Sequence, residues 1–190
     1  MSARSPRWSL HDVLVMATLA ALGGMGGSIV SLIGKAVQAT LGTFGGLQWL
    51  AGIHVLWLVL AVGLVRKPGA ATLTGLLKGA VELLSGNPHG LLVLLYSGVA
   101  GLAVDVVWLL LARRHHVVTY ALAGGTAAAA NLLVLRLVAD LPAHGPVLWV
   151  LVGLALLAFA SGAVLAGALG WWLIGALGRA GVTGASATTG

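Results

Sequence analysis

The sequence contains no cysteine, which excludes disulfide bonds and cysteine-based metal sites. Acidic residues are also scarce, because the 190 residues include only 4 Asp and Glu against 10 Lys and Arg, for a formal net charge of +6. Charged residues together make up 7% of the chain and aromatic residues 6%. The basic residues form neither a run nor a stripe with aromatic residues, so we expect no nucleic-acid partner.

Apolar residues dominate the composition. They make up 59% of the chain, with a mean hydropathy of +1.07, whereas an average soluble domain is about 45–50% apolar. The apolar runs are continuous, unlike the alternating strands of a membrane barrel, and a helical span needs about 20 such residues. The sequence therefore predicts an all-α integral membrane protein. Six transmembrane helices are expected near residues 11–33, 47–65, 69–84, 91–112, 117–139 and 147–178, in one domain over 1–179 with a disordered tail at 180–190.

The positions of the basic residues predict the topology. Seven of them precede the first predicted span, follow the last, or join the second to the third and the fourth to the fifth: Arg4, Arg7, Arg66, Lys67, Arg113, Arg114 and Arg179. All seven fall on one side of the membrane, and the positive-inside rule makes that side cytoplasmic. We therefore expect both termini inside and a multi-pass protein of the bacterial cytoplasmic membrane.

Small residues recur at helical spacing in the first and last spans. Such positions let helices approach closely in lipid. Ala17 and Ala21 form one such pair, and the others are Gly23 with Gly27, Gly162 with Ala166, and Ala163 with Gly167. Each pair is typical either of packing inside the bundle or of a face for a partner membrane protein. The partner interpretation suits the first span better.

Polar side chains inside the predicted spans are the main functional signal, since each ionisable group near the bilayer centre costs about 2.5–3.5 kcal/mol. Lys78 and Glu82 lie one turn apart, so they form either a self-neutralising ion pair or part of a ligand site. Other polar or aromatic side chains fall at similar outer depth: Gln48, His54, Trp57, Tyr96 and Asn131. We predict that they line a vestibule open to the outside, although a lone histidine such as His54 also fits a packing role.

The turn after the third span contains Asn87 and His89, and this turn is either a lid over the vestibule or a plain reversal between two helices. Trp49 lies at the outer start of the second span. Asp105 lies about 21 Å along its span from Leu91 at helical rise, too deep for that vestibule, so we expect it to pair inside the bundle. The remaining tryptophans lie near predicted span ends, as in an interfacial belt: Trp8, Trp108, Trp149, Trp171 and Trp172.

No motif supports catalysis, nucleotide binding or a metal site. There is no P-loop, nucleophile elbow or H-E-x-x-H sequence, and the six histidines lack ligand spacing. We therefore expect no enzymatic activity, no cofactor and no metal.

An ordered set of short motifs runs through residues 66–105: Arg66-Lys67-Pro68-Gly69-Ala70, Val81-Glu82, Gly86-Asn87-Pro88, Gly90, and Gly101-Leu102 with Asp105. This set resembles the YkoE family, the substrate-binding S-components of energy-coupling factor (ECF) vitamin transporters. The resemblance implies a six-helix S-component fold that binds thiamine or its hydroxymethylpyrimidine (HMP) part near the outer surface. It also implies a transmembrane coupling subunit, which Ala17 and Ala21 would contact, and two cytoplasmic ATPase subunits.

Glu82 suits an aminopyrimidine edge, because a carboxylate can accept hydrogen bonds from an amino group. Trp57, Trp49 or Tyr96 would stack on the flat rings. A rival interpretation is a stand-alone secondary transporter with a proton path through Glu82, Asp105 and Arg136, and a third is a membrane scaffold that binds no small molecule.

Overall fold

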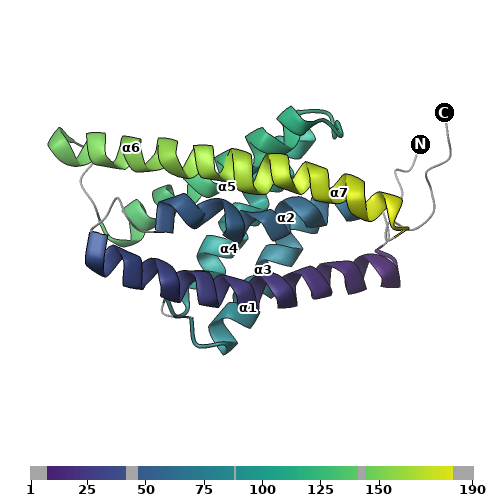
Figure 1. Ribbon diagram of the computed structural model, residues 1–190, viewed down its shortest axis with the longest axis horizontal. Coiled ribbons are helices and arrows are strands. Elements are labelled where there is room, and N and C mark those ends of the chain that lie inside the picture. The colour runs from purple at the N-terminus through teal and green to yellow at the C-terminus, as the bar shows by residue number, and fades with distance from the viewer. Residues whose placement is uncertain (1–7, 42–46, 88, 141–143, 182–190) are drawn as a thin grey trace.

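The structure is a computed structural model that describes residues 8–41, 47–87, 89–140 and 144–181. All regular secondary structure in these residues is helical (Figure 1). The elements are α1 (Leu10–Leu41), the 3₁₀-helix η2 (Leu47–Leu50), α2 (Ala51–Val65), α3 (Ala70–Leu84), α4 (Leu92–Leu110), α5 (Val117–Val138), α6 (Gly145–Ser161), the π-helix η3 (Gly162–Ala168) and α7 (Leu169–Arg179). The predicted tail lies largely outside the described residues.

The helices coincide closely with the six predicted segments, with two differences. The first helix continues to Leu41, because the polar residues after Ile33 end the apolar run without breaking the helix. The last predicted helix is a continuous α6–η3–α7 rod that includes one π-helical stretch. Four helices in the described part of the chain are long and apolar enough to cross a membrane: Leu10–Val37, Leu92–Leu110, Val117–Val138 and Gly145–Arg179. The helices α2 and α3 have 15 residues each and are shorter than a typical span.

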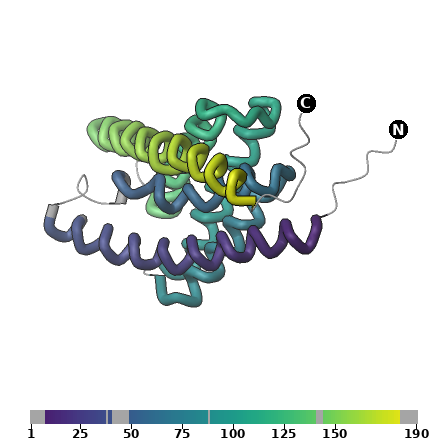
Figure 2. Tube along the Cα trace, turned by 45° about the vertical axis from the view of Figure 1, so that its right-hand side comes forward, coloured from purple at the N-terminus to yellow at the C-terminus, as the bar shows by residue number. Residues whose placement is uncertain are grey.

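The helix α2 lies at the centre of the bundle. Figures 1 and 2 show it between α1 on one side and the α6–η3–α7 rod on the other. Its consecutive residues from Leu58 to Val62 are all buried, so no face of the helix is left for lipid. A helix that is apolar all round is expected to be enclosed in this way.

Close backbone approach holds the last helical rod against α5. A Cβ atom built on Gly162 would lie 2.3 Å from the carbonyl oxygen of Gly124, and one built on Gly167 would lie 2.3 Å from the Cα atom of Ala121. No hydrophobic effect drives helices together in lipid, so such contacts supply van der Waals packing instead. The small residues of the last span therefore pack inside the bundle.

Asp105 ties α4 to the start of α3. The residue before α3 is Gly69, which has no side chain to cap the helix. Asp105 supplies the missing acceptor from the neighbouring helix, because its carboxylate accepts hydrogen bonds from the Thr72 amide at 2.8 Å, the Thr72 hydroxyl at 2.6 Å and the Ala71 amide at 3.3 Å. The expected internal pairing is therefore with a helix N-terminus, whose dipole favours a negative charge.

Polar contacts also join elements at the end of the bundle where α1 begins. Asp12 forms an ion pair with Lys67, which links α1 to the turn between α2 and α3. The belt prediction for Trp108 is wrong, since this side chain is only 1% exposed and lies beneath the guanidinium of Arg113. Trp149, Trp171 and Trp172 are exposed, as a belt requires.

We expect Asp105→Ala to lower the free energy of unfolding by about 0.5–2 kcal/mol, the range for loss of a helix cap, because two α3 amides lose their acceptor. Thermal unfolding of the detergent-solubilised protein checks this. Asp140→Asn is the control, since Asp140 is exposed and asparagine tolerates the positive φ of 47° at this position. Equal effects of the two substitutions would contradict the capping role.

Candidate ligand-binding site

A cavity of about 270 Å³ lies among α1, α2, α3, α4 and α5. This volume lies just below the roughly 300–1,000 Å³ that is typical of small-molecule sites. Its apolar walls come from α2, α4 and α5, including Val55, Leu58, Ala100 and Leu132. Eight polar side chains also line it: Ser31, His54, Lys78, Glu82, His89, Tyr96, Ser97 and Asn131. A cavity with this lining suits a small ligand that is mostly apolar and has a few polar groups.

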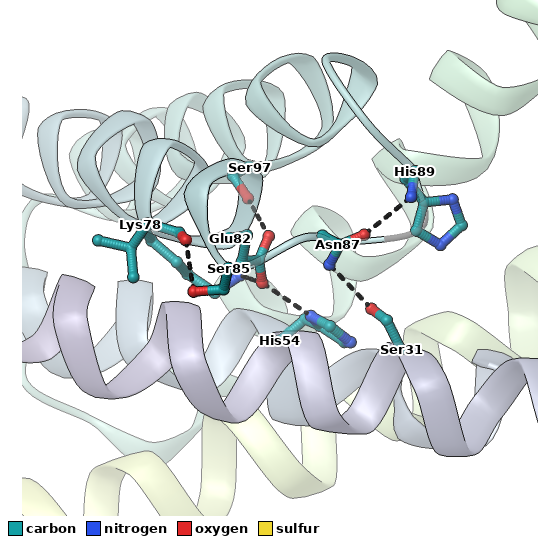
Figure 3. Close-up of polar contacts among 9 residues, drawn as sticks. Ser31, His54, Lys78, Glu82, Ser85, Asn87, His89 and Ser97 are labelled. Carbon is teal, nitrogen blue, oxygen red and sulfur yellow. Dashed lines mark hydrogen bonds and ion pairs between the residues drawn. The ribbon is translucent and has the colours of Figure 1, made fainter.

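The carboxylate of Glu82 is the centre of the polar cluster. Its Oε1 atom accepts a hydrogen bond from Nζ of Lys78 at 2.5 Å, one turn earlier on α3. Lys78 is 2% exposed and Glu82 is 1% exposed, so both charges are buried. Figure 3 shows Glu82 between Ser97 and His54, with Ser97 Oγ 3.4 Å from Oε2. The predicted pairing of Lys78 and Glu82 is therefore present, and it lies inside the cavity.

His54 brings α2 into the same cluster. Its Nδ1 atom lies 3.5 Å from Oε1 of Glu82 (Figure 3). A neutral imidazole that carries its proton on Nδ1 can point it at this carboxylate, which leaves Nε2 as an acceptor. The structure thus brings together His54, Lys78 and Glu82 from two helices.

Two polar atoms of the lining have no partner among the described residues. They are Nε2 of His54 and Oδ1 of Asn131, and both are buried. Buried polar atoms are nearly always hydrogen-bonded, and an unpaired one costs about 1–3 kcal/mol. A bound ligand that donates hydrogen bonds would satisfy both atoms, so these atoms mark where its polar edge would lie.

The turn between α3 and α4 closes one side of the cavity. Gly86 has a φ of 74°, and the amides of Gly86 and Asn87 donate to the carbonyls of Leu83 and Glu82, which is a Schellman cap. Asn87 is buried and donates from Nδ2 to the Ser31 hydroxyl at 3.3 Å, which fixes the turn to α1 (Figure 3). These contacts hold Gly86 and Asn87 against α3 and α1 beside the cavity.

His89 follows in this turn and packs against Tyr96. Their rings meet edge to face, with centroids 6.0 Å apart. Burial lowers the pKa of His89, and the nearby positive charge of Lys35 lowers it further. His89 therefore favours its neutral form, in which it can donate or accept a hydrogen bond at the cavity wall.

Glycines of α1 allow this helix to approach the cluster. A Cβ atom built on Gly27 would lie 2.0 Å from Oε1 of Glu82 and 3.2 Å from Nδ1 of His54. Only a residue without a side chain leaves this room for the carboxylate. For Gly27 the sequence predicts either packing inside the bundle or a face for a partner, and it does not indicate the contact with Glu82 or the site roles of Ser31 and Ser97. The sequence feature that points to Gly27 is its place in a G-x-x-x-G pair, because a glycine on a neighbouring span leaves room for a buried carboxylate such as that of Glu82.

Some predicted site residues lie elsewhere. Trp57 does not line the cavity but packs against Gly23 of α1, where a Cβ atom would lie 2.6 Å from its ring. Trp49 is 58% exposed, and its carbonyl accepts a hydrogen bond from Ser161. Asn87 supports the wall through Ser31 and is not itself in the lining. The side chain of Gln48 lies outside the described part of the structure.

The two small-residue pairs of α1 point in different directions. Gly23 and Gly27 are buried against α2 and α3, whereas Ala17 is exposed and Ala21 is half-buried. The glycine pair therefore belongs to the bundle, and the alanine pair lies on a more open face.

Comparisons with known proteins agree on a membrane transport component. Residues 11–130 match the family described as "ABC-type cobalt transport system, permease component". A protein of Bacillus subtilis (strain 168), named as a candidate HMP/thiamine permease protein, YkoE, is 27% identical over 166 residues, which cover 86% of this chain and 81% of that protein. A solved structure described as the crystal structure of an S-component of an ECF transporter superposes with a TM-score of 0.86 at 25% identity, and the match covers 95% of this chain and 91% of that one.

We expect Gly27→Ala to lower the free energy of unfolding by about 1–3 kcal/mol, the usual range for overpacking, because the added methyl group displaces the Glu82 carboxylate from Lys78. Gly26→Ala is the matched control, since nothing lies within 4 Å of a Cβ atom at Gly26. In the Gly26→Ala variant the free energy of unfolding should rise by about 0.5–1 kcal/mol, because alanine has a better helix propensity than glycine. Thermal unfolding in detergent compares them, and a stabilised Gly27→Ala variant would contradict the close approach.

Proposed function

Because the chain belongs to the family of permease components of ABC-type cobalt transport systems, as a YkoE-like relative with the fold of an ECF S-component, we propose that it captures thiamine or its HMP part for import. The family and fold make it a multi-pass membrane protein and a substrate-binding component. The identity of the ligand rests on the cavity chemistry. The observation that carries the proposal is the buried Glu82 cluster beside two unpartnered polar atoms, inside a cavity of about 270 Å³.

The cavity chemistry suits an aminopyrimidine. An exocyclic amino group offers two donors, and the cavity offers acceptors at Glu82, His54 and Asn131. Hydrogen bonds to a carboxylate are charge-assisted and about twice as strong as neutral ones. The apolar walls would cover the ring faces, and the phenol ring of Tyr96 would stack beside them.

Cobalt, which the family description names, fits the residues poorly. No group of three or more His, Cys, Asp or Glu side chains in the described ranges is arranged to hold a metal ion. The pair His54 and Glu82 supplies two ligands at most, and Lys78 already occupies the carboxylate. An organic ligand therefore accounts for the cavity better than a transition-metal ion does.

The proposed topology places the cavity toward the extracellular side and the basic turns in the cytoplasm. Arg66, Lys67, Arg113, Arg114 and Arg179 flank the helix ends opposite to the α3–α4 turn, which supports this orientation. The proposed partners are a transmembrane coupling subunit and two cytoplasmic ATPase subunits. The more open face of α1, where Ala17 is exposed and Ala21 is half-buried, is a surface on which another membrane helix can pack closely.

We expect Glu82→Gln to weaken binding of thiamine and of HMP at least tenfold, because the amide removes the charged acceptor and leaves Lys78 without its counterion. Calorimetric titration of the purified protein measures this. Asp140→Asn serves as the control, since it removes an exposed carboxylate outside the cavity. Unchanged affinity in Glu82→Gln would remove this carboxylate from the site.

A proton-coupled secondary transporter is the second candidate, and the geometry gives it less support. Asp105 is held at the first turn of α3, and Glu82 lies ten residues further along, or about 15 Å at helical rise. The carboxylates are therefore not in contact along a proton path.

Uptake of labelled thiamine by cells should require co-expression of the coupling and ATPase subunits if the chain is an S-component. Loss of uptake on mutation of the ATPase nucleotide site would agree with this. Uptake by the chain alone, driven by an imposed pH gradient, would instead establish the secondary transporter.

A further inference from the structure

We propose that this cavity selects an uncharged heterocycle over a cationic one of the same shape, and that Lys78 sets this selectivity. The inference rests on the proposed function, since it concerns the same cavity, but it assigns the charge class of the ligand. It follows from where the few carboxylates of the chain lie and from what each of them contacts.

Only one carboxylate side chain is available to the cavity. The whole sequence contains four acidic side chains. Asp12 pairs with Lys67, Asp105 caps α3, and Asp140 is exposed beyond the end of α5. Glu82 is therefore the sole acidic residue in the lining.

The charge of Glu82 is already compensated. Nζ of Lys78 lies 2.5 Å from Oε1, and both side chains are buried. The pair has zero net charge whether the proton stays on the ammonium group or moves to the carboxylate. A ligand that enters the cavity therefore meets a dipole instead of a negative charge.

The other ionisable groups near the cavity can add only positive charge near neutral pH. His54 and His89 line it and are either neutral or positive, and the Lys35 side chain is near enough to act electrostatically on His89. A tyrosine phenol such as that of Tyr96 is uncharged near neutral pH. The net charge of the lining is thus zero or positive, and a buried ligand cation would have no counterion.

Aromatic rings in the lining do not replace the missing counterion of a ligand cation. Trp57 packs against Gly23 and Trp49 is largely exposed, so neither tryptophan lines the cavity. Indole offers the strongest cation–π attraction. Tyr96 remains as the phenol face, beside the edge-on ring of His89.

An uncharged aminoheterocycle has what the lining requires. Its amino donors satisfy Nε2 of His54 and Oδ1 of Asn131, which have no partner in the described residues. Its ring fits between the apolar walls, and the small volume of the cavity favours a single ring. HMP meets these conditions, whereas thiamine adds a thiazolium cation and a second ring.

The test compares ligands that differ in charge alone. Thiamine and 3-deazathiamine, its uncharged thiophene isostere, are titrated by calorimetry into the purified full-length protein in detergent, with HMP as the third probe. The wild-type protein should bind the isostere at least tenfold more tightly than thiamine. In Lys78→Gln the freed carboxylate becomes a counterion for the cation, so the ratio should shift at least tenfold toward thiamine.

The outcomes distinguish failure of this inference from failure of the proposed function. Thiamine binding more tightly than the isostere to the wild-type protein overturns the charge selectivity but leaves the proposed function in place. An unchanged ratio in a folded Lys78→Gln variant overturns the role of Lys78. If that variant does not fold, the wild-type ratio still decides the selectivity. Binding of none of the three probes overturns the proposed function together with this inference.

Discussion

Lys78 and Glu82 carry opposite charges on adjacent turns of α3, within the interior of a bundle that contains few other charges. Burial of such a pair costs more in lost hydration than the ions regain unless further polar groups surround it. His54 and Ser97 are those groups, and they come from α2 and α4. The ion pair therefore fixes how three helices are rotated relative to one another, and the cavity forms where their polar faces meet.

The glycines of α1 allow this helix to pack closely against the helices that carry the ion pair and His54. Gly23 leaves room for the Trp57 ring, Gly24 for Val81, and Gly27 for the Glu82 carboxylate, so side chains of α2 and α3 pack directly on the backbone of α1. Close contact of this kind replaces the hydrophobic effect as the source of packing energy in lipid. It also places Ser31, one turn after Gly27, in the wall of the cavity, where it fixes Asn87.

Two features of the structure could be predicted from the sequence. Membrane helices appear in a sequence as continuous apolar runs, and two residues at i and i+4 on one helix lie side by side whatever the rest of the fold is. The helix bounds and the Lys78–Glu82 contact follow from those two rules. The rotation of α2 about its own axis could not be predicted in this way. A helix that is apolar on all sides has no polar face to indicate which side points toward the cavity. His54 and Trp57 lie only about 60° apart around that helix, yet the first lines the cavity and the second packs against α1. Likewise, the capping of α3 by Asp105 spans more than thirty residues of sequence, and no local pattern encodes it.

The central claim is that the cavity around Glu82 binds a small, flat heterocycle. The most direct measurement is mass spectrometry of the small molecules released when the protein, purified from cells grown with thiamine and HMP, is denatured. The account predicts release of an aminopyrimidine in near-equimolar amount to the protein. Release of phospholipid alone, with no heterocycle at any detectable ratio, would contradict it.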